Sequence, residues 1–175
     1  GGGQVDACRA LRSPGSTLKP LIYALAMDQD CLYPCETLND GTLDYGRYAP
    51  ENFDERYRGL VTADKALQLS LNVPAVTVLE RVGTEHFHAF LPRAGITTVT
   101  KSPQHYGLGL TLGNCEVRLE EMAAAYAMVA NLGIYRPLSI HERQPERSEM
   151  RRLSRGTCLK LYEMLEQTPP GEFER

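Results

Sequence analysis

The stretch that decides the fold is residues 16–27, which read Ser-Thr-Leu-Lys-Pro-Leu-Ile-Tyr-Ala-Leu-Ala-Met. Leucine and isoleucine recur in it at positions 18, 21, 22 and 25. This spacing places apolar side chains on one face of an α-helix. Pro20 is tolerated only near the first turn, because proline lacks the backbone N–H that a helix interior needs. We therefore predict a helix with an apolar face that begins close to Ser16.

The helical pattern continues through most of the chain. Further helices are predicted at residues 62–69, 74–82, 84–94 and 119–131, and a last amphipathic helix places Leu161, Tyr162 and Leu165 on one face. Strand-like stretches are few, at residues 96–100 and 136–140. Residues 30–60 have little helical period and are rich in Gly, Pro, Asn, Asp and Tyr, so a long functional loop is predicted there. The fold class is predicted to be mainly α.

The composition is that of an ordinary soluble domain. Of 175 residues, 42% are hydrophobic and 23% are charged, which excludes a disordered tail, a collagen-like fibre and a disulfide miniprotein. The net charge of −3 argues against a nucleic-acid partner. No apolar run approaches the roughly 18–20 residues that a membrane-spanning helix needs.

Cysteines and histidines give no strong sign of a metal site. The five cysteines are scattered and favour buried small apolar side chains; they are Cys8, Cys31, Cys35, Cys115 and Cys158. Cys31 and Cys35 are close enough in sequence for a disulfide or a zinc site, but no second close pair supports zinc. His86 and His88 are two residues apart and so lie on different faces of a helix. We predict no metal and no cofactor.

Ser16-Thr17-Leu18-Lys19 is a Ser-x-x-Lys motif at the start of the first predicted helix. Residues three apart share a helix face, about 5–6 Å from each other. A lysine amine there can take the serine proton if burial lowers its pKa. The helix N-terminus adds a positive dipole end that suits a developing oxyanion. The alternative is a serine cap beside an exposed lysine.

Ser70-Leu71-Asn72 lies between two predicted helices, just before Pro74. Residues in such a connection can point into a cleft. Ser70 could relay a proton, and the Asn72 amide can donate and accept hydrogen bonds with a peptide backbone. The alternative is that Asn72 only caps the following helix.

Both motifs occur within longer phrases: residues 12–20 read Arg-Ser-Pro-Gly-Ser-Thr-Leu-Lys-Pro, and residues 70–76 read Ser-Leu-Asn-Val-Pro-Ala-Val. These phrases resemble the first two active-site motifs of penicillin-binding protein transpeptidases, whose serine set is completed by Lys-Thr-Gly. Residues 50–54, 59–62, 112–113, 117–123 and 125–127 resemble further stretches of that family. The resemblance runs from about residue 2 to residue 165. Its wording is most similar to the 1C type, a bifunctional protein that joins a glycosyltransferase to a transpeptidase.

The resemblance implies a peptidoglycan D,D-transpeptidase that cross-links the cell wall. Ser16 would attack the penultimate D-alanine of a stem peptide, and Lys19 would be the base that activates it. Ser70 would pass the proton to the leaving amine, and Asn72 would hold the substrate amide. The implied partners are peptidoglycan stem peptides, with β-lactam antibiotics as covalent inhibitors at Ser16.

The sequence departs from the family in one respect, because no Lys-Thr-Gly or Lys-Ser-Gly follows Asn72. Lys101-Ser102-Pro103 is no substitute, since Pro103 replaces the glycine along which substrate backbone lies. We therefore expect residues 1–175 to be a partial transpeptidase domain, the helical part of an α+β, β-lactamase-like fold with most of its central sheet missing. The isolated chain is expected to be inactive and to expose an apolar face, which would favour self-association.

The parent protein is expected to be membrane-anchored at the periplasmic face of the bacterial inner membrane. Gly1-Gly2-Gly3 carries no targeting signal, which the expectation of an excised fragment explains. Two alternatives remain: a β-lactamase or β-lactam sensor of the same fold, and a non-catalytic helical interaction module. The last predicts that Ser16 and Lys19 face solvent or lie far from Ser70.

Overall fold

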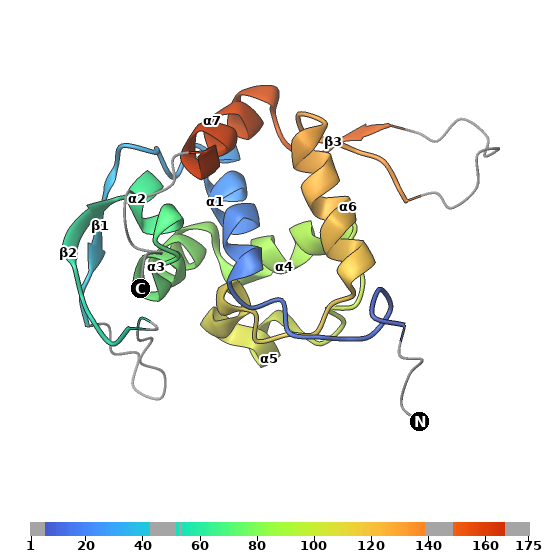
Figure 1. Ribbon diagram of the computed structural model, residues 1–175, viewed down its shortest axis with the longest axis horizontal. Helices are drawn as coiled ribbons and strands as arrows, with labels where there is room; N and C mark the ends of the chain where they lie inside the picture. Colours follow the sequence, from blue (N-terminus) through green and yellow to red (C-terminus); the bar gives the residue numbers. More distant parts are fainter. Residues whose placement is uncertain (1–5, 43–51, 53, 139–148, 167–175) are drawn as a thin grey trace.

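The computed structural model describes residues 6–42, 52, 54–138 and 149–166, and these are mainly helical (Figure 1). The predicted fold class is confirmed. The described elements, in chain order, are η1 (Gly15–Leu18), α1 (Lys19–Asp28), β1 (Thr37–Asp40), β2 (Gly59–Thr62), α2 (Ala63–Gln68), α3 (Asn72–Val82), α4 (Thr84–Arg93), α5 (Pro103–Tyr106), η2 (Gly107–Leu112), α6 (Leu119–Ala130), β3 (Ile134–Tyr135), β4 (Met150–Arg151) and α7 (Arg155–Glu166), where η marks a 3₁₀ helix.

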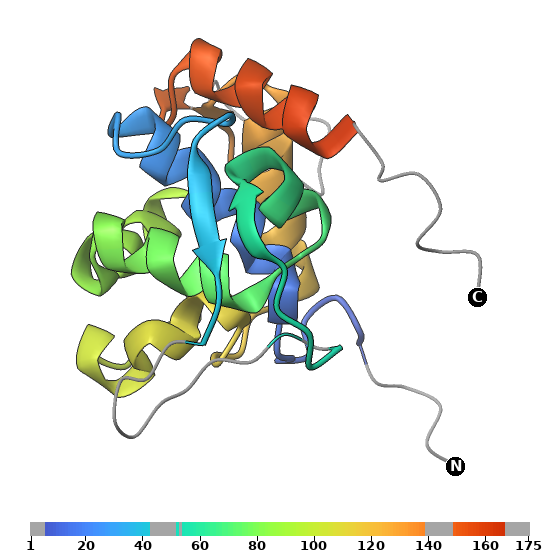
Figure 2. The same cartoon turned by 90° about the vertical axis from the view of Figure 1, so that its left-hand side faces the viewer.

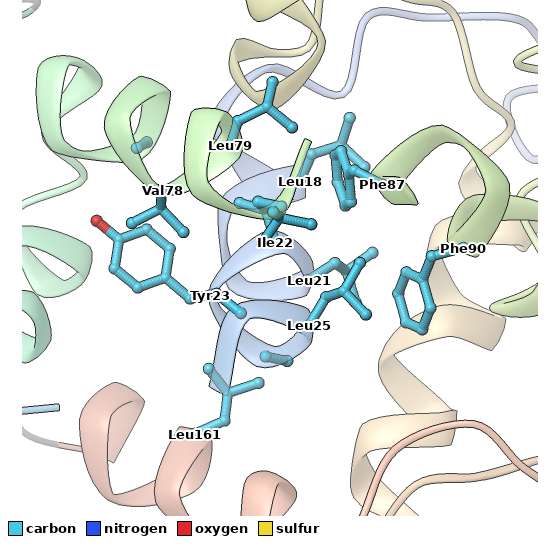
Figure 3. Close-up of a cluster of buried hydrophobic side chains, with 14 of the residues drawn as sticks. Leu18, Leu21, Ile22, Tyr23, Leu25, Val78, Leu79, Phe87, Phe90 and Leu161 are labelled. Carbon is cyan, nitrogen blue, oxygen red and sulfur yellow. The ribbon is translucent and has the colours of Figure 1, made fainter. Parts of the chain in front are cut away.

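Helix α1 is the centre of the molecule. It lies between α3 on one side and α6 on the other, and it also contacts α7 (Figure 1). A 3₁₀ turn precedes it, so that the α-helix begins at Lys19 and Pro20 occupies the first turn, as predicted. In Figure 3, Leu21, Ile22 and Leu25 lie among Leu79, Phe87 and Phe90, whereas Tyr23 points away from them, toward Val78.

The expectation of one apolar face on α1 was too narrow, because every residue from position 19 to 27 is buried. The remaining positions carry Tyr23, Ala24, Ala26 and Met27, which are also apolar or amphipathic and pack against other helices. An α-helix that is apolar all round is a buried one. Helix α1 therefore leaves no bare face of its own.

The other predicted helices are present, with small shifts at their ends. Pro74 lies in the first turn of α3, and Gly83 ends that helix at a φ of +88°, as glycine can. Thr84 is the first residue of α4 rather than its cap. In α7, Leu161 is buried and Tyr162 is half-buried, but Leu165 is 43% exposed, so the predicted apolar face ends one turn early.

The strand predictions were wrong in position. Residues 96–100 form no strand; Ile96 is buried, and Thr97 and Thr98 instead donate hydrogen bonds to the carboxylate of Glu121. Strand β3 ends before residue 136, and residues 139 and 140 lie outside the described part of the chain.

A β-ribbon lies within the segment predicted as a loop. Strands β1 and β2 pair antiparallel, with Thr37 opposite Thr62 and Asp40 opposite Gly59. The ribbon lies along the outside of α2 and α3, where its length is visible in Figure 2. It carries Asp40, a fully buried carboxylate, toward the turn between α2 and α3. Within the described residues, no helix is long and apolar enough to cross a membrane.

Candidate active site

Lys19 is a deeply buried lysine at the centre of the predicted site. Its side chain is 1% exposed, although it is the first residue of α1. The Nζ atom donates to the carbonyl oxygen of Ser70 at 2.5 Å, to Oγ of Ser70 at 3.2 Å and to Oδ1 of Asn72 at 2.7 Å. Buried amines need such partners, because an unpaired one carries a large desolvation cost. The structure thus brings together three of the four predicted site residues.

The turn between α2 and α3 presents Ser70 and Asn72 to Lys19. After α2 ends, the N–H of Ser70 donates to the carbonyl of Leu67 at 2.9 Å, and the backbone at Ser70 takes a φ of +53°. Left-handed backbone is unusual for a residue with a Cβ and is enriched at functional sites. Helix α3 then starts at Asn72, with Leu71 as its N-cap and no side-chain capping bond. The alternative in which Asn72 merely caps this helix is therefore wrong.

A second polar pair, absent from the sequence prediction, anchors the same turn. Asn52 accepts a hydrogen bond at Oδ1 from the backbone N–H of Asn72 at 2.8 Å. Its Nδ2 donates to both carboxylate oxygens of Asp40, at 2.7 and 3.0 Å, and to the carbonyl of Arg56 at 2.8 Å. Both side chains are buried, with Asn52 4% and Asp40 0% exposed. The only sequence signal for this pair is the family-like phrase at residues 50–54, which by itself assigns Asn52 no role.

Ser16 lies in η1, one turn before Lys19, and is exposed. Its carbonyl accepts the backbone N–H of Lys19. Within the described part of the chain, the Ser16 hydroxyl makes no hydrogen bond, so the structure does not join it directly to the Lys19 amine. Its place at the surface leaves the hydroxyl open to a large substrate.

The turn that carries Ser16 is held against Gly113. A Cβ built on Gly113 would lie 2.2 Å from the backbone nitrogen of Gly15, so only glycine allows this approach. The hydroxyl of Ser13 also donates to the carbonyl of Gly113 at 2.8 Å. Gly113 ends η2 in a left-handed conformation, with a φ of +81°. The 3₁₀ helix η2, which ends at Gly113, thus supports the Ser16 turn.

The burial of Lys19 changes its acid–base chemistry. Desolvation lowers the pKa of the Lys19 amine from 10.5 to about 8, because the charged form loses its contact with water. No carboxylate among the described residues forms an ion pair with it. A neutral amine keeps a lone pair, to which the Ser70 hydroxyl, 3.2 Å away, can donate. Lys19 can therefore act as a proton acceptor at mildly alkaline pH.

An apolar groove of about 490 Å³ lies beside the Ser16 turn. Its walls come from residues 7–17 and from α6, including Pro14, Thr17, Met122 and Tyr126. The hydroxyl of Tyr126 donates to the carbonyl of Thr17 at 2.9 Å and so ties the two walls together. The predicted exposed apolar face thus has a counterpart on α6, although not on α1.

The sequence predicts no metal site, and within residues 6–42, 52, 54–138 and 149–166 no cluster of His, Cys, Asp and Glu could hold an ion. His86 contacts the carbonyl of Val82, and His88 contacts that of Lys101, so the two rings have separate partners. Cys31 and Cys35 are free thiols, which leaves the suggested disulfide unsupported. Cys115 and Cys158 are buried as predicted, whereas Cys8 and Cys35 are exposed.

Comparison with known proteins identifies the family. The family model described as "Penicillin binding protein transpeptidase domain" matches residues 4–170. Penicillin-binding protein 1C of Escherichia coli (strain K12) is 41% identical over 131 residues, which cover 75% of this chain and 17% of that protein. Penicillin-binding protein 1F of Bacillus subtilis (strain 168) is 38% identical over 129 residues, which cover 72% of this chain and 17% of that protein. The chain thus spans about a sixth of the length of these curated relatives.

Solved structures agree on the fold. A peptidoglycan glycosyltransferase from Burkholderia ambifaria superimposes with a TM-score of 0.82 at 18% identity, covering 94% of this chain and 58% of that one. The TP domain of penicillin-binding protein 3 from Burkholderia pseudomallei superimposes with a TM-score of 0.79 at 19% identity, covering 91% of this chain and 54% of that one. The described helices correspond to a helical part of that fold. The family predicted from the two motifs is confirmed, and the chain belongs to the penicillin-binding protein transpeptidase domain family.

Proposed function

We propose that this chain carries the Ser-x-x-Lys and Ser-x-Asn part of the active site of a peptidoglycan D,D-transpeptidase. The observation that carries the proposal is the buried Lys19 amine, which contacts both Ser70 and Asn72. A surface lysine beside a serine cap would show neither the burial nor the contacts across 51 residues of sequence. Family membership supplies the reaction class.

The first half of the reaction is acylation of Ser16. The Oγ atom attacks the carbonyl carbon of the penultimate D-alanine, and its proton passes to the neutral amine of Lys19. The developing oxyanion lies at the N-terminal end of η1 and α1, where backbone N–H groups and the helix dipole favour negative charge. The C–N bond then breaks, and the proton travels by way of Ser70 to the leaving D-alanine amine. An ester between Ser16 and the stem peptide results.

The second half transfers the acyl group to an amine of a neighbouring stem peptide. That amine attacks the ester carbonyl and forms the new C–N bond, while the bond to Ser16 breaks. The proton that the amine loses returns to the Ser16 oxygen through Ser70 and Lys19, so that the enzyme is regenerated. Asn72 hydrogen-bonds the substrate amide in both steps. β-Lactams acylate Ser16 in the same way.

The proposal extends to the protein as a whole. Residues 1–175 would be part of a transpeptidase domain whose Lys-Thr-Gly strand lies outside the sequence, in a membrane-anchored protein on the periplasmic face that also carries a glycosyltransferase. The names of the 1A and 1C relatives support the presence of a glycosyltransferase. We expect the 175-residue chain alone to be inactive, because the third motif supplies a second oxyanion N–H in the family.

Labelling with fluorescent penicillin tests the proposal. The full-length gene product should be labelled covalently, and Ser16→Ala should abolish the label, while Ser102→Ala, at an exposed serine outside both motifs, should retain it. Label retained in Ser16→Ala would refute the nucleophile assignment. A slow, stoichiometric label indicates a transpeptidase, whereas rapid multiple turnover of the antibiotic would indicate the β-lactamase alternative. No label in either protein would favour the non-catalytic module.

A further inference from the structure

A line of hydrogen bonds, buried between Asp40 and Asn52 and partly buried at Asn72, connects strand β1 to Lys19. Asp40 accepts from Asn52, Asn52 accepts from the backbone of Asn72, and the side chain of Asn72 accepts from Lys19. The backbone N–H of Arg58 donates to the same carboxylate at 2.9 Å, which fixes Asp40 from β2's side. The segment between α1 and α2 thus reaches the site, although it contains neither predicted motif.

The Asp40 carboxylate determines how the Asn52 amide is oriented. An ionised carboxylate only accepts hydrogen bonds, so it selects the NH₂ group of Asn52. The amide oxygen must then face the opposite way, toward the N–H of Asn72. With the amide reversed, its NH₂ group would meet that N–H, and its oxygen would meet the carboxylate. Asp40 therefore leaves one orientation available.

This orientation matters because of where Asn72 lies. Its N–H is the first of α3 and has no partner within the helix. Asn52 provides that partner, and so fixes the start of α3 at the point where the turn presents Ser70 and Asn72 to Lys19. Without it, this half-buried N–H would lose its hydrogen bond to Asn52, and the turn could rotate away from the amine.

We propose that Asn52 and Asp40 are positioning residues for the Lys19–Ser70–Asn72 arrangement. Asn52 holds the backbone of Asn72, and Asp40 holds Asn52 in the required orientation. Neither residue contacts the nucleophile or needs to touch substrate. The inference rests on the proposed function, since it assigns these residues to the acylation step.

The test measures the two steps of Ser16 acylation by a β-lactam in the full-length gene product: the reversible binding constant and the acylation rate constant. Asn52→Ala should lower the rate constant about tenfold, the size expected for one buried hydrogen bond, and change binding less than about twofold. Asp40→Asn, which keeps the shape but allows either amide orientation, should give a smaller loss of about threefold. Asn39→Ala, an exposed neighbour in β1, is the control and should leave both constants unchanged.

A double-mutant comparison separates positioning from general support of the fold. In an Asn72→Ala background, Asn52→Ala should cost less than about threefold, because the contact of the Asn72 side chain with Lys19 is already lost and only the contacts of Ser70 with Lys19 remain to be disturbed. An equal loss in both backgrounds would overturn the inference, and so would wild-type rates in both single variants. If Asn52→Ala does not fold, Asp40→Asn decides. A wild-type protein that is not acylated would refute the proposed function, whereas normal acylation with unaffected variants would refute only the positioning role.

Discussion

Gly113 offers the sharpest test of how the Ser16 turn is held. A Cβ at this position would lie 2.2 Å from the nitrogen, 2.5 Å from the Cα and 2.7 Å from the carbonyl oxygen of Gly15. All three atoms belong to backbone, which cannot rotate away as a side chain can. Gly113→Ala must therefore move the turn that precedes Ser16.

Two costs add in Gly113→Ala. A residue with a Cβ at a φ of +81° costs about 1 kcal/mol or slightly more. Forcing backbone apart in a packed region costs about 1–3 kcal/mol in addition. Gly107 is a control without a clash, because a Cβ added there would meet nothing within 4 Å beyond its own chain neighbours, although its φ of +55° and ψ of −151° also favour glycine. Gly107→Ala should therefore cost about 1–3 kcal/mol through its own backbone strain alone, without displacing the turn that precedes Ser16.

Urea unfolding followed by pulse proteolysis measures the free energy of unfolding of this region in the full-length gene product. Penicillin acylation measures the effect on Ser16. Since a displacement of about 1 Å at a reacting group can cost on the order of 100-fold, Gly113→Ala should slow acylation far more than Gly107→Ala. Equal effects of the two variants on stability and on acylation would refute the proposed support of the Ser16 turn by Gly113.

Four further predictions concern the site and its surroundings. Because burial lowers the pKa of Lys19 from 10.5 to about 8, the unfolded chain binds more protons than the folded one between these pH values. The free energy of unfolding should therefore rise across this pH window by roughly 3 kcal/mol relative to Lys19→Met. An absence of this difference in urea titrations would contradict the burial of Lys19. The acylation rate should likewise rise with an apparent pKa near 8, as the Lys19 amine becomes neutral. Ser70→Gly should be about 1 kcal/mol more stable than Ser70→Ala in thermal unfolding, since both variants lose the hydroxyl but only glycine adopts the positive φ without strain. Equal stabilities of the two variants would argue against backbone strain at this position. Glu121→Ala should lower the free energy of unfolding by about 2–3 kcal/mol, because the carboxylate accepts three hydrogen bonds from Thr97 and Thr98. Glu120→Ala should change it by less than about 0.5 kcal/mol, and similar losses in both variants would show that these bonds are not the reason.

The helices could be predicted because their signals are local. Apolar spacing, the early Pro20 and the glycine after α3 each specify structure within a few residues. The β1–β2 ribbon could not be found in this way, since its strands are short and far apart in sequence, with Asp40 pairing to Gly59. The strand predicted at residues 96–100 failed because Glu121, distant in sequence, accepts the backbone N–H of Thr97, which a neighbouring strand would otherwise have bound.

The same difference between local sequence signals and contacts of distant residues applies to the candidate site. The two motifs indicate Lys19, Ser70 and Asn72, and the structure places these three in contact. Asn52 and Asp40 could not be assigned from sequence, because their importance depends on a fold that brings the segment before α2 back to the start of α3. The exposed Ser16 hydroxyl was also unexpected, since helical spacing alone suggests a direct contact with Lys19.

Because α1 is buried on every side, the two ends of the Ser-x-x-Lys motif should differ in how readily their backbone amides exchange with solvent. Amide protons from Leu21 to Met27 lie in the core, so their exchange with solvent requires unfolding of the whole helical unit. Ser16 and Thr17 lie in an exposed 3₁₀ turn, where local opening is enough. Ser16, the proposed nucleophile, therefore lies on backbone that can open locally, whereas the lysine three residues later is fixed in the core. A boundary between exposed and buried backbone passes through the four residues of the motif.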